Sequence, residues 1–153
     1  MSIKITFLGT GTSQGVPIVA CDCEVCTSHD SRDKRLRSSI LIETEKTRVI
    51  IDAGPDFRFQ LLREKIKRLD AVVFSHEHKD HIAGLDDVRA FNFINQMVMP
   101  VYGTERVHKA IQREFAYIFA DEKYPGIPQV ELKIINDTAF EVNGVDVIPI
   151  EVL

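Results

Sequence analysis

The sequence has 153 residues, 44% hydrophobic and 27% charged, and its net charge at pH 7 is −4. These values fit one globular domain and exclude a general attraction to nucleic acid or anionic lipid. No apolar run approaches the roughly 20 residues of a membrane-spanning helix, and the N-terminus, MSIKITFLGTGTSQG, has no secretory cleavage site. We therefore expect a cytoplasmic protein with no membrane association.

The first part of the chain predicts strands, one long loop and a helix. Apolar and polar residues alternate over residues 3–8, which predicts a strand. A polar loop, residues 17–38, contains all the cysteines. A β-hairpin follows, formed by residues 39–44 and 48–52. Asp56 is then a suitable N-cap for the helix that begins the next segment.

The second part alternates strands and helices. The wholly apolar run 71–74 predicts a buried central strand. A helix over residues 85–94 and a strand over 98–102 come next, followed by an amphipathic helix over 105–119. Three further strands are expected at 131–135, 139–142 and 145–150, with a hairpin turn at Asn143-Gly144. This interleaving predicts the α/β class.

The C-terminus interrupts an apolar strand. The last residues, from Val145 to Leu153, are mostly apolar, and no polar tail follows them. Domains usually end on the surface with soluble residues. This pattern favours a chain that is the N-terminal part of a longer domain.

The segment from Ser75 to His81, SHEHKDH, places three histidines and an aspartate within six residues. Imidazole and carboxylate are ligands for zinc, manganese and iron. In an extended stretch His76 and His78 point to the same side, whereas Asp80 and His81 lie past a turn and can face a second ion. Two ions roughly 3.5–4 Å apart can activate a bridging hydroxide. A surface loop rich in histidine by chance is disfavoured, because the cluster directly follows an apolar strand.

The string His-x-His-x-Asp-His resembles the signature of the metallo-β-lactamase superfamily. Two further motifs resemble patterns of that family and occur in the expected order: Leu8-Gly9-Thr10-Gly11 and Ile51-Asp52-Ala53-Gly54. The resemblance implies an αββα sandwich, of which residues 1–153 supply roughly the N-terminal half within a single domain.

The resemblance also implies a role for each residue of the cluster. It makes His76 and His78 ligands of a first metal, and Asp80 and His81 ligands of a second. Asp52 corresponds to the carboxylate that orients a liganded histidine; the alternative is a turn aspartate without that role. The family's remaining ligands come from its C-terminal half. We therefore expect this chain to show no more than marginal hydrolysis.

One further histidine follows the cluster. His108 lies in the helix expected over residues 105–119. We expect it on the surface of that helix and assign it no metal.

A second metal site is predicted at Cys21, Cys23 and Cys26. Three clustered cysteines favour metal binding over a disulfide framework, and they could hold one zinc with a fourth ligand. Three unrelated thiols are the alternative, and His29 is a fourth ligand by spacing alone. The triplet, preceded by the run TGTSQGVP, resembles the cyclic phosphodiesterases of bacterial phosphonate breakdown and a related protein of pyrroloquinoline quinone biosynthesis. That resemblance implies a structural zinc whose fourth ligand is a C-terminal histidine, with His29 a bystander.

These resemblances imply a metal-dependent phosphodiesterase that acts on small or cyclic phosphodiesters. Its cofactors would be two divalent ions, zinc or manganese, and Asp80 and Asp52 would be its catalytic carboxylates. One alternative is a ribonuclease of the tRNA 3′-processing type, which the cysteine triplet and the lack of a tRNA-grasping insertion disfavour. Another is a non-catalytic metal-binding accessory protein of cofactor biosynthesis. A nucleic-acid partner is not favoured, and an oligomer is compatible with the sequence.

Overall fold

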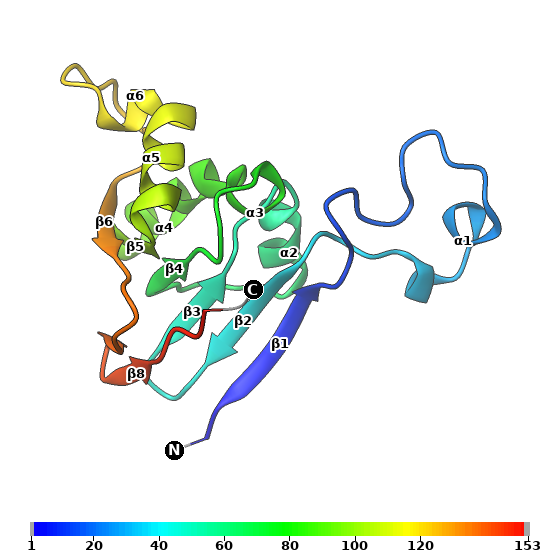
Figure 1. The fold of residues 1–153 in the computed structure, drawn as a ribbon, viewed down its shortest axis with the longest axis horizontal. Coiled ribbons are helices and arrows are strands. Elements are labelled where there is room, and N and C mark those ends of the chain that lie inside the picture. Colours follow the sequence, from blue (N-terminus) through cyan, green and yellow to red (C-terminus); the bar gives the residue numbers. More distant parts are fainter. Residues whose placement is uncertain (1, 152–153) are drawn as a thin grey trace.

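A six-stranded mixed sheet forms the centre of the computed structural model, which describes residues 2–151 (Figure 1). Its strands, in spatial as well as chain order, are β1 (Lys4–Gly9), β2 (Ser39–Glu43), β3 (Arg48–Ile51), β4 (Ala71–Val73), β5 (Met99–Gly103) and β6 (Val130–Ile134). The first three are antiparallel, and β3 to β6 run parallel to one another. The α/β class predicted from the sequence is confirmed.

Helices cover one face of this sheet. They are α2 (Phe57–Arg63), α3 (Lys79–Ile82), the 3-10 turn η2 (Leu85–Val88), α4 (Arg89–Asn95), α5 (Glu105–Glu114) and α6 (Ala116–Phe119). The main core joins alternate residues of the strands, such as Leu41, Ile50 and Val72, to helical residues such as Phe57 and Ile111. Within residues 2–151 no helix combines the length and apolarity needed to cross a bilayer.

The other face of the sheet is covered in part by a hairpin of β7 (Phe140–Val142) and β8 (Val145–Val147). Val142 of this hairpin packs in a second cluster with Val49 and Tyr102 of the sheet. On β1 the same face is open, and Ile5 and Phe7 are 57% and 64% exposed. The sheet therefore has one face under helices and one apolar face under a single hairpin.

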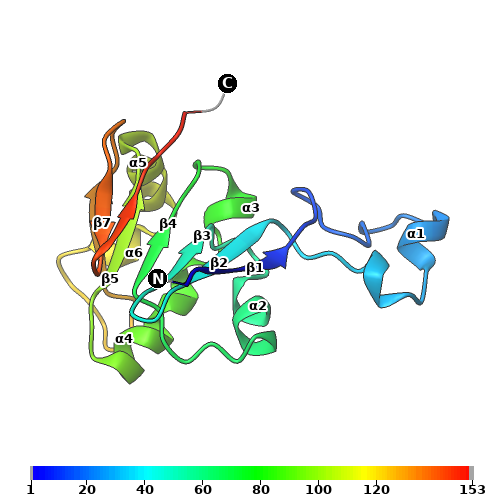
Figure 2. The ribbon, with the colours of Figure 1, turned by 90° about the horizontal axis from the view of Figure 1, so that it is seen from below.

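The predicted cysteine loop is an arm that projects from the body in both ribbon views (Figures 1 and 2). It contains the short helical turns α1 (Glu24–Thr27) and η1 (Ser31–Asp33). Backbone hydrogen bonds close its base: the N–H of Gly11 donates to the carbonyl of Leu36 at 2.7 Å, and Val16 and Arg35 exchange bonds of 2.8 Å.

Three local expectations need correction. The predicted helix over 105–119 breaks at Phe115, whose φ and ψ are −118° and 41°, into α5 and α6. The last strand ends at Val147, because its partner β7 begins only at Phe140, the residue that pairs with it. Asp56 does stand at the N-cap of α2, yet its side chain makes no cap. It accepts hydrogen bonds from the backbone and guanidinium of Arg37 instead.

The predicted turn between β7 and β8 is confirmed. Asn143 and Gly144 have φ of 48° and 79°, the left-handed pair that a tight two-residue hairpin requires.

Candidate metal centre

The histidine loop, residues 75–81, follows β4, and its last residues lie in the single turn of α3. His78 is the N-cap residue of α3, and its carbonyl accepts from the N–H groups of His81 and Ile82 at 3.0 and 3.1 Å. His76 and His78 precede this turn, and their ring centroids lie 4.7 Å apart. The ring of His81 folds back to 3.9 Å from that of His76. The turn expected between the two halves of the motif is therefore present.

Asp80 and His81 place two metal-ligating atoms face to face. His81 Nε2 lies 3.2 Å from Asp80 Oδ2. Two ligands at about 2.1 Å from one tetrahedral zinc ion stand about 3.4 Å apart, so this pair fits a shared ion. Within residues 2–151, however, no three ligand atoms of the histidine loop all lie within 4.8 Å of one another. Its side chains meet as neighbouring pairs.

Asp52 is buried behind the loop, with 5% of its surface exposed and a left-handed φ of 66°. Its carboxylate accepts three hydrogen bonds: from the N–H and hydroxyl of Ser75, at 2.8 and 2.7 Å, and from His81 Nδ1 at 2.7 Å. An ionised carboxylate only accepts, so the Nδ1 of His81 carries its proton. The lone pair of Nε2 is then directed away from Asp52, as metal ligation requires.

Ser75 is a site residue to which the sequence analysis gave no role. Its hydroxyl donates to Asp52, and it stands 3.0 Å from His76 Nδ1. Since its single proton is given to Asp52, the serine oxygen accepts from His76. Asp52 thus fixes His81 directly and His76 through Ser75. The parallel register that pairs Ile51 with Val73 brings Asp52 and Ser75 together at the ends of their strands. This strand pairing is the signal from which the contact of Ser75 with Asp52 could have been predicted.

Gly54 lets the turn after β3 dock under the histidine loop. A Cβ atom there would lie 2.0 Å from the carbonyl oxygen of Asp80, closer than any side chain allows. The preceding residue, Ala53, donates its N–H to the carbonyl of His81 at 2.8 Å. The Asp-Ala-Gly sequence therefore supports the loop with both its carboxylate and its backbone.

The local environment favours a neutral imidazole at His76. Burial lowers its pKa below the ordinary histidine value, and the neighbouring His81 lowers it further, while the Asp52 carboxylate opposes both effects. Neutral imidazole is the form that binds a metal.

His108 is buried, which contradicts the expectation of a surface residue. Only 6% of it is exposed. It lies on the inner face of α5 with Val107 and Ile111, against Gly103 of β5. The helical spacing of these residues places His108 toward the sheet, and its pKa is lowered by burial.

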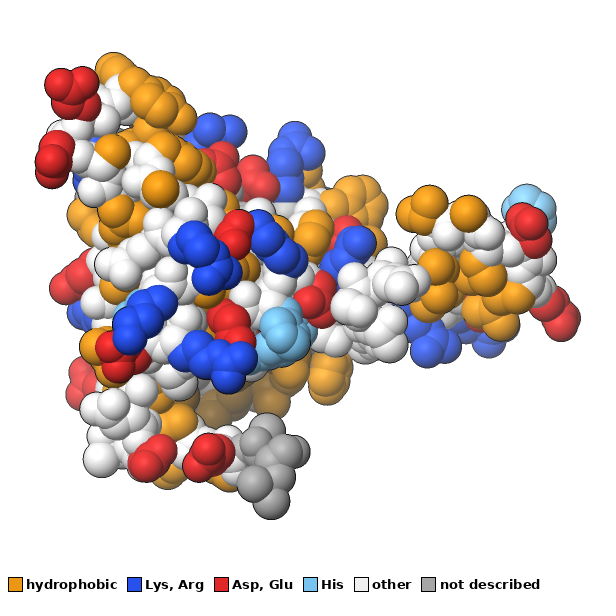
Figure 3. All heavy atoms as spheres, turned by 45° about the horizontal axis from the view of Figure 1, so that its top comes forward, with side chains coloured by type: hydrophobic (Ala, Val, Ile, Leu, Met, Phe, Trp, Pro, Cys, Tyr) orange, Lys and Arg blue, Asp and Glu red, His pale blue; other side chains and the backbone are white. Residues whose placement is uncertain are grey.

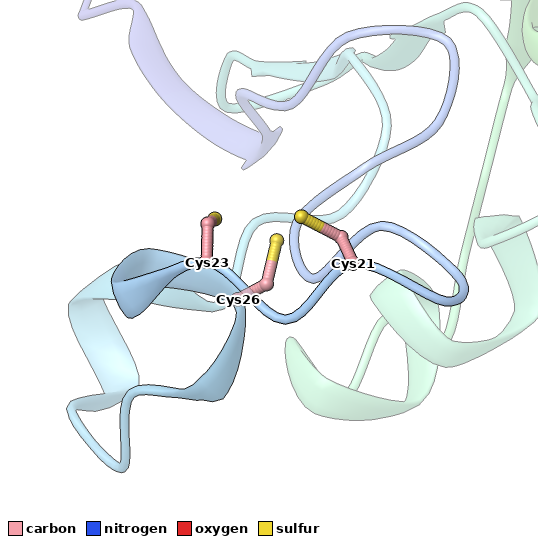
Figure 4. A group of neighbouring side chains, drawn as sticks. All are labelled: Cys21, Cys23 and Cys26. Atoms are coloured by element: carbon pink, nitrogen blue, oxygen red, sulfur yellow. The ribbon is translucent and has the colours of Figure 1, made fainter.

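The three cysteines meet in the projecting arm (Figure 4). Their Sγ atoms all lie within 4.8 Å of one another, and His29 is not part of this group. Cys26 is buried and accepts from the N–H of Ile18 at 3.4 Å, whereas Cys23 is exposed. A backbone hydrogen bond from Cys26 lowers the pKa of the Cys23 thiol, helped by the side chain of Cys21. Three convergent thiols, one of them biased toward thiolate, fit a zinc ion with one further ligand.

The sequence matches the family model of the beta-lactamase superfamily domain over residues 47–153. The chain therefore belongs to the metallo-β-lactamase superfamily. An octanoyltransferase of Porphyromonas gingivalis is 41% identical over 99% of this chain and 31% of its own length. A ribonuclease Z of Bradyrhizobium sp. is 26% identical over 92% of this chain and 44% of its own length.

Solved structures give the same fold. A diphosphatase from the PhnP family is 43% identical and superposes with a TM-score of 0.88, over 97% of this chain and 56% of that one. Zinc-bound PqqB from Methylobacterium extorquens, at 23% identity, superposes with a TM-score of 0.72 over 90% and 48%. The chain thus spans between about a third and just over half of these relatives.

Proposed function

We propose that this chain carries the metal-binding half-site of a hydrolase that cleaves phosphodiesters in small or cyclic substrates. The observation that carries the proposal is the contact series from Asp52 to His81 and on to Asp80, at 2.7 and 3.2 Å. One buried carboxylate holds the imidazole, and a second carboxylate faces its free nitrogen. This arrangement orients metal ligands and has no evident use in a structural turn.

In this proposal His76 and His78 hold one divalent ion, and Asp80 and His81 hold a second. Two such ions supply a nucleophile derived from water near neutral pH and offset the charge on an attacked phosphorus. The chain's own part is orientation. Asp52 keeps the Nδ1 proton on His81, and Ser75 keeps the Nδ1 proton on His76, so each ring has its Nε2 free for a metal ion.

The phosphorus substrate class is supported by the PhnP-family diphosphatase, which shares 43% identity with this chain. The cysteine arm supports the same substrate class, because its triplet resembles that of the cyclic phosphodiesterases of phosphonate breakdown and its three Sγ atoms lie within 4.8 Å of one another. We assign that site a structural zinc and the histidine centre zinc or manganese. The zinc in PqqB supports the choice of metal for a protein of this fold.

Two other activities remain as second candidates. The resemblance to ribonuclease Z favours an RNA substrate, whereas the resemblance to coenzyme PQQ synthesis protein B favours an accessory role in cofactor biosynthesis. The name octanoyltransferase belongs to a protein of which this chain matches 31%. We favour a phosphodiesterase over acyl transfer because two carboxylates and three imidazoles are a ligand set for two metal ions. The Ser75 hydroxyl, the nucleophile that acyl transfer would need, gives its proton to Asp52 and accepts from His76.

The test is metal content and hydrolysis measured on the same protein. We expect ions beyond the one bound by the cysteines, and slow, chelator-sensitive hydrolysis of bis-p-nitrophenyl phosphate or 2′,3′-cyclic nucleotides. Asp80→Asn should abolish the hydrolysis, whereas Asp137→Asn, an exposed carboxylate far along the chain, should not. A protein that binds only the cysteine-held ion contradicts the proposed centre. Cleavage of tRNA precursors without cleavage of small diesters would favour the ribonuclease.

A further inference from the structure

A groove lies beside the histidine loop, between that loop and the exposed face of α5. Its volume is about 660 Å³, and Glu77, His78 and Lys79 form its wall on the loop side. Arg106, Lys109 and other residues of α5 form the opposite wall. In the space-filling view, lysine and arginine side chains gather around a histidine surface (Figure 3).

The basic residues of α5 are aligned along this groove by the helical repeat. Arg106, Lys109 and Arg113 stand three and four residues apart, so they share one face. The opposite face is fixed by burial of Val107 and Ile111 in the core. The packing of α5 on the sheet therefore turns its cations toward the histidine loop.

Carboxylates balance these cations incompletely. Arg106 pairs with Glu77, and Lys109 pairs with Glu105 at 2.7 Å. Glu114, in contrast, is shared by Lys79 and Arg113. Four cations thus face three carboxylates, and the groove has an excess positive charge on a chain whose net charge is −4.

The cations of these ion pairs can exchange their carboxylate partners for an anionic ligand. The cationic side chains of Lys79, Arg106, Lys109 and Arg113 are between 68% and 80% exposed. Ion pairs in such positions contribute little to stability. A phosphate that enters the groove can replace Glu114 as the partner of Arg113, whose planar guanidinium suits two phosphate oxygens.

We propose that this groove binds a second phosphate group of the substrate, next to the phosphate that reacts at the histidine centre. The inference rests on the proposed function for the position of the reacting phosphate. His78 lines the groove and also belongs to the histidine loop, so the two phosphates would be close neighbours in one small molecule. The substrate class is therefore a small compound with two phosphates, such as an organic diphosphate.

The test is a titration of the full chain, freed of metal, with inorganic diphosphate and with inorganic phosphate, followed by NMR. Metal-free protein is used because diphosphate would otherwise chelate the bound ions, and the resulting shifts could be mistaken for binding in the groove. We expect the largest amide shifts in residues 105–114, and tighter binding of diphosphate than of phosphate. The double variant Lys109→Gln/Arg113→Gln should weaken diphosphate binding about fivefold to tenfold, the effect of two exposed charge contacts. The matched control Lys46→Gln/Lys67→Gln removes two exposed cations elsewhere and should change it less than twofold.

Equal losses of diphosphate affinity in both double variants, or amide shifts confined to other segments, would overturn the proposal that the groove binds phosphate. Tighter binding of a five-nucleotide RNA than of diphosphate through the same residues would overturn the small-molecule assignment. Because the titration needs neither metal nor turnover, it separates a failure of the groove from a failure of the hydrolase. An inactive protein with an intact diphosphate site would contradict only the proposed function.

Discussion

His81 Nδ1 and Asp52 Oδ2 lie 2.7 Å apart, with the carboxylate buried and the imidazole facing Asp80 on its other side. The pair joins the turn after β3 to the histidine loop after β4. It decides which imidazole nitrogen is free, and three predictions about the centre and its support start from it.

Asp52→Asn should weaken metal binding at the histidine centre by roughly 10- to 100-fold, the usual effect of losing a carboxylate behind a liganded histidine. Asparagine tolerates the left-handed φ of 66° at this position, so the backbone is expected to persist. Metal titration by calorimetry measures the change, with Asp137→Asn as the control. An unchanged affinity in Asp52→Asn would show that Asp52 does not position His81.

Ser75→Ala should release His76 from its hydrogen-bonded orientation while leaving the Asp52–His81 contact in place. We expect loss of metal affinity at the histidine centre of about tenfold, and a mixture of His76 tautomers in the nitrogen NMR spectrum. Ser75→Thr keeps a hydroxyl and should restore a single tautomer. If Ser75→Ala leaves the tautomer of His76 unchanged, the serine has no positioning role.

Gly54→Ala should destabilise the fold, because the new methyl group meets the carbonyl oxygen of Asp80 at 2.0 Å. We expect a loss of about 3 kcal/mol in the free energy of unfolding, measured by urea titration. Gly126→Ala is the comparison: its φ is 91°, and no atom lies within 4 Å of the added carbon. That variant has only the left-handed penalty of about 1–2 kcal/mol. An equal loss in both variants would contradict the close approach at Gly54.

Cys23→Ser should reduce the bound zinc by one ion per chain and leave the histidine centre able to bind metal. The thiol is exposed, so the substitution disturbs no core packing. Native mass spectrometry gives the stoichiometry, and Ser13→Ala, an exposed hydroxyl before the arm, serves as the control. Unchanged zinc content in Cys23→Ser would mean that the thiols are not ligands.

His108 should make the fold sensitive to acid. Burial lowers its pKa in the folded protein, whereas the unfolded chain has the ordinary value of about 6.5. The unfolded state therefore binds more protons as the pH falls below that value, and stability present at neutral pH is lost. We expect the urea midpoint to decrease between pH 7 and pH 5, and less steeply in His108→Gln. Identical pH profiles for the two proteins would contradict this assignment.

The element pattern of the sequence predicted most of the fold. Alternation, apolar runs and turn residues placed the six strands of the sheet, and Asn143-Gly144 placed the hairpin turn. The errors lie where a partner strand or a neighbouring side chain overrides local preference. Asp56 is a suitable N-cap residue by its local sequence, but its carboxylate is hydrogen-bonded to the Arg37 guanidinium instead of the helix backbone. The helical pattern of 105–119 continues through Phe115, yet the backbone breaks there.

By itself the sequence determined which groups are available for metal binding: His76, His78, Asp80 and His81 in one loop, and the cysteines in another. Ligand chemistry follows from residue type, and close spacing along the chain ensures proximity. Only the tertiary structure decided that Asp52 acts on His81, that Ser75 extends the contact to His76, and that α5 turns its cations toward His78. These contacts join segments 20 to 35 residues apart, and only strand register and helix packing bring such segments together.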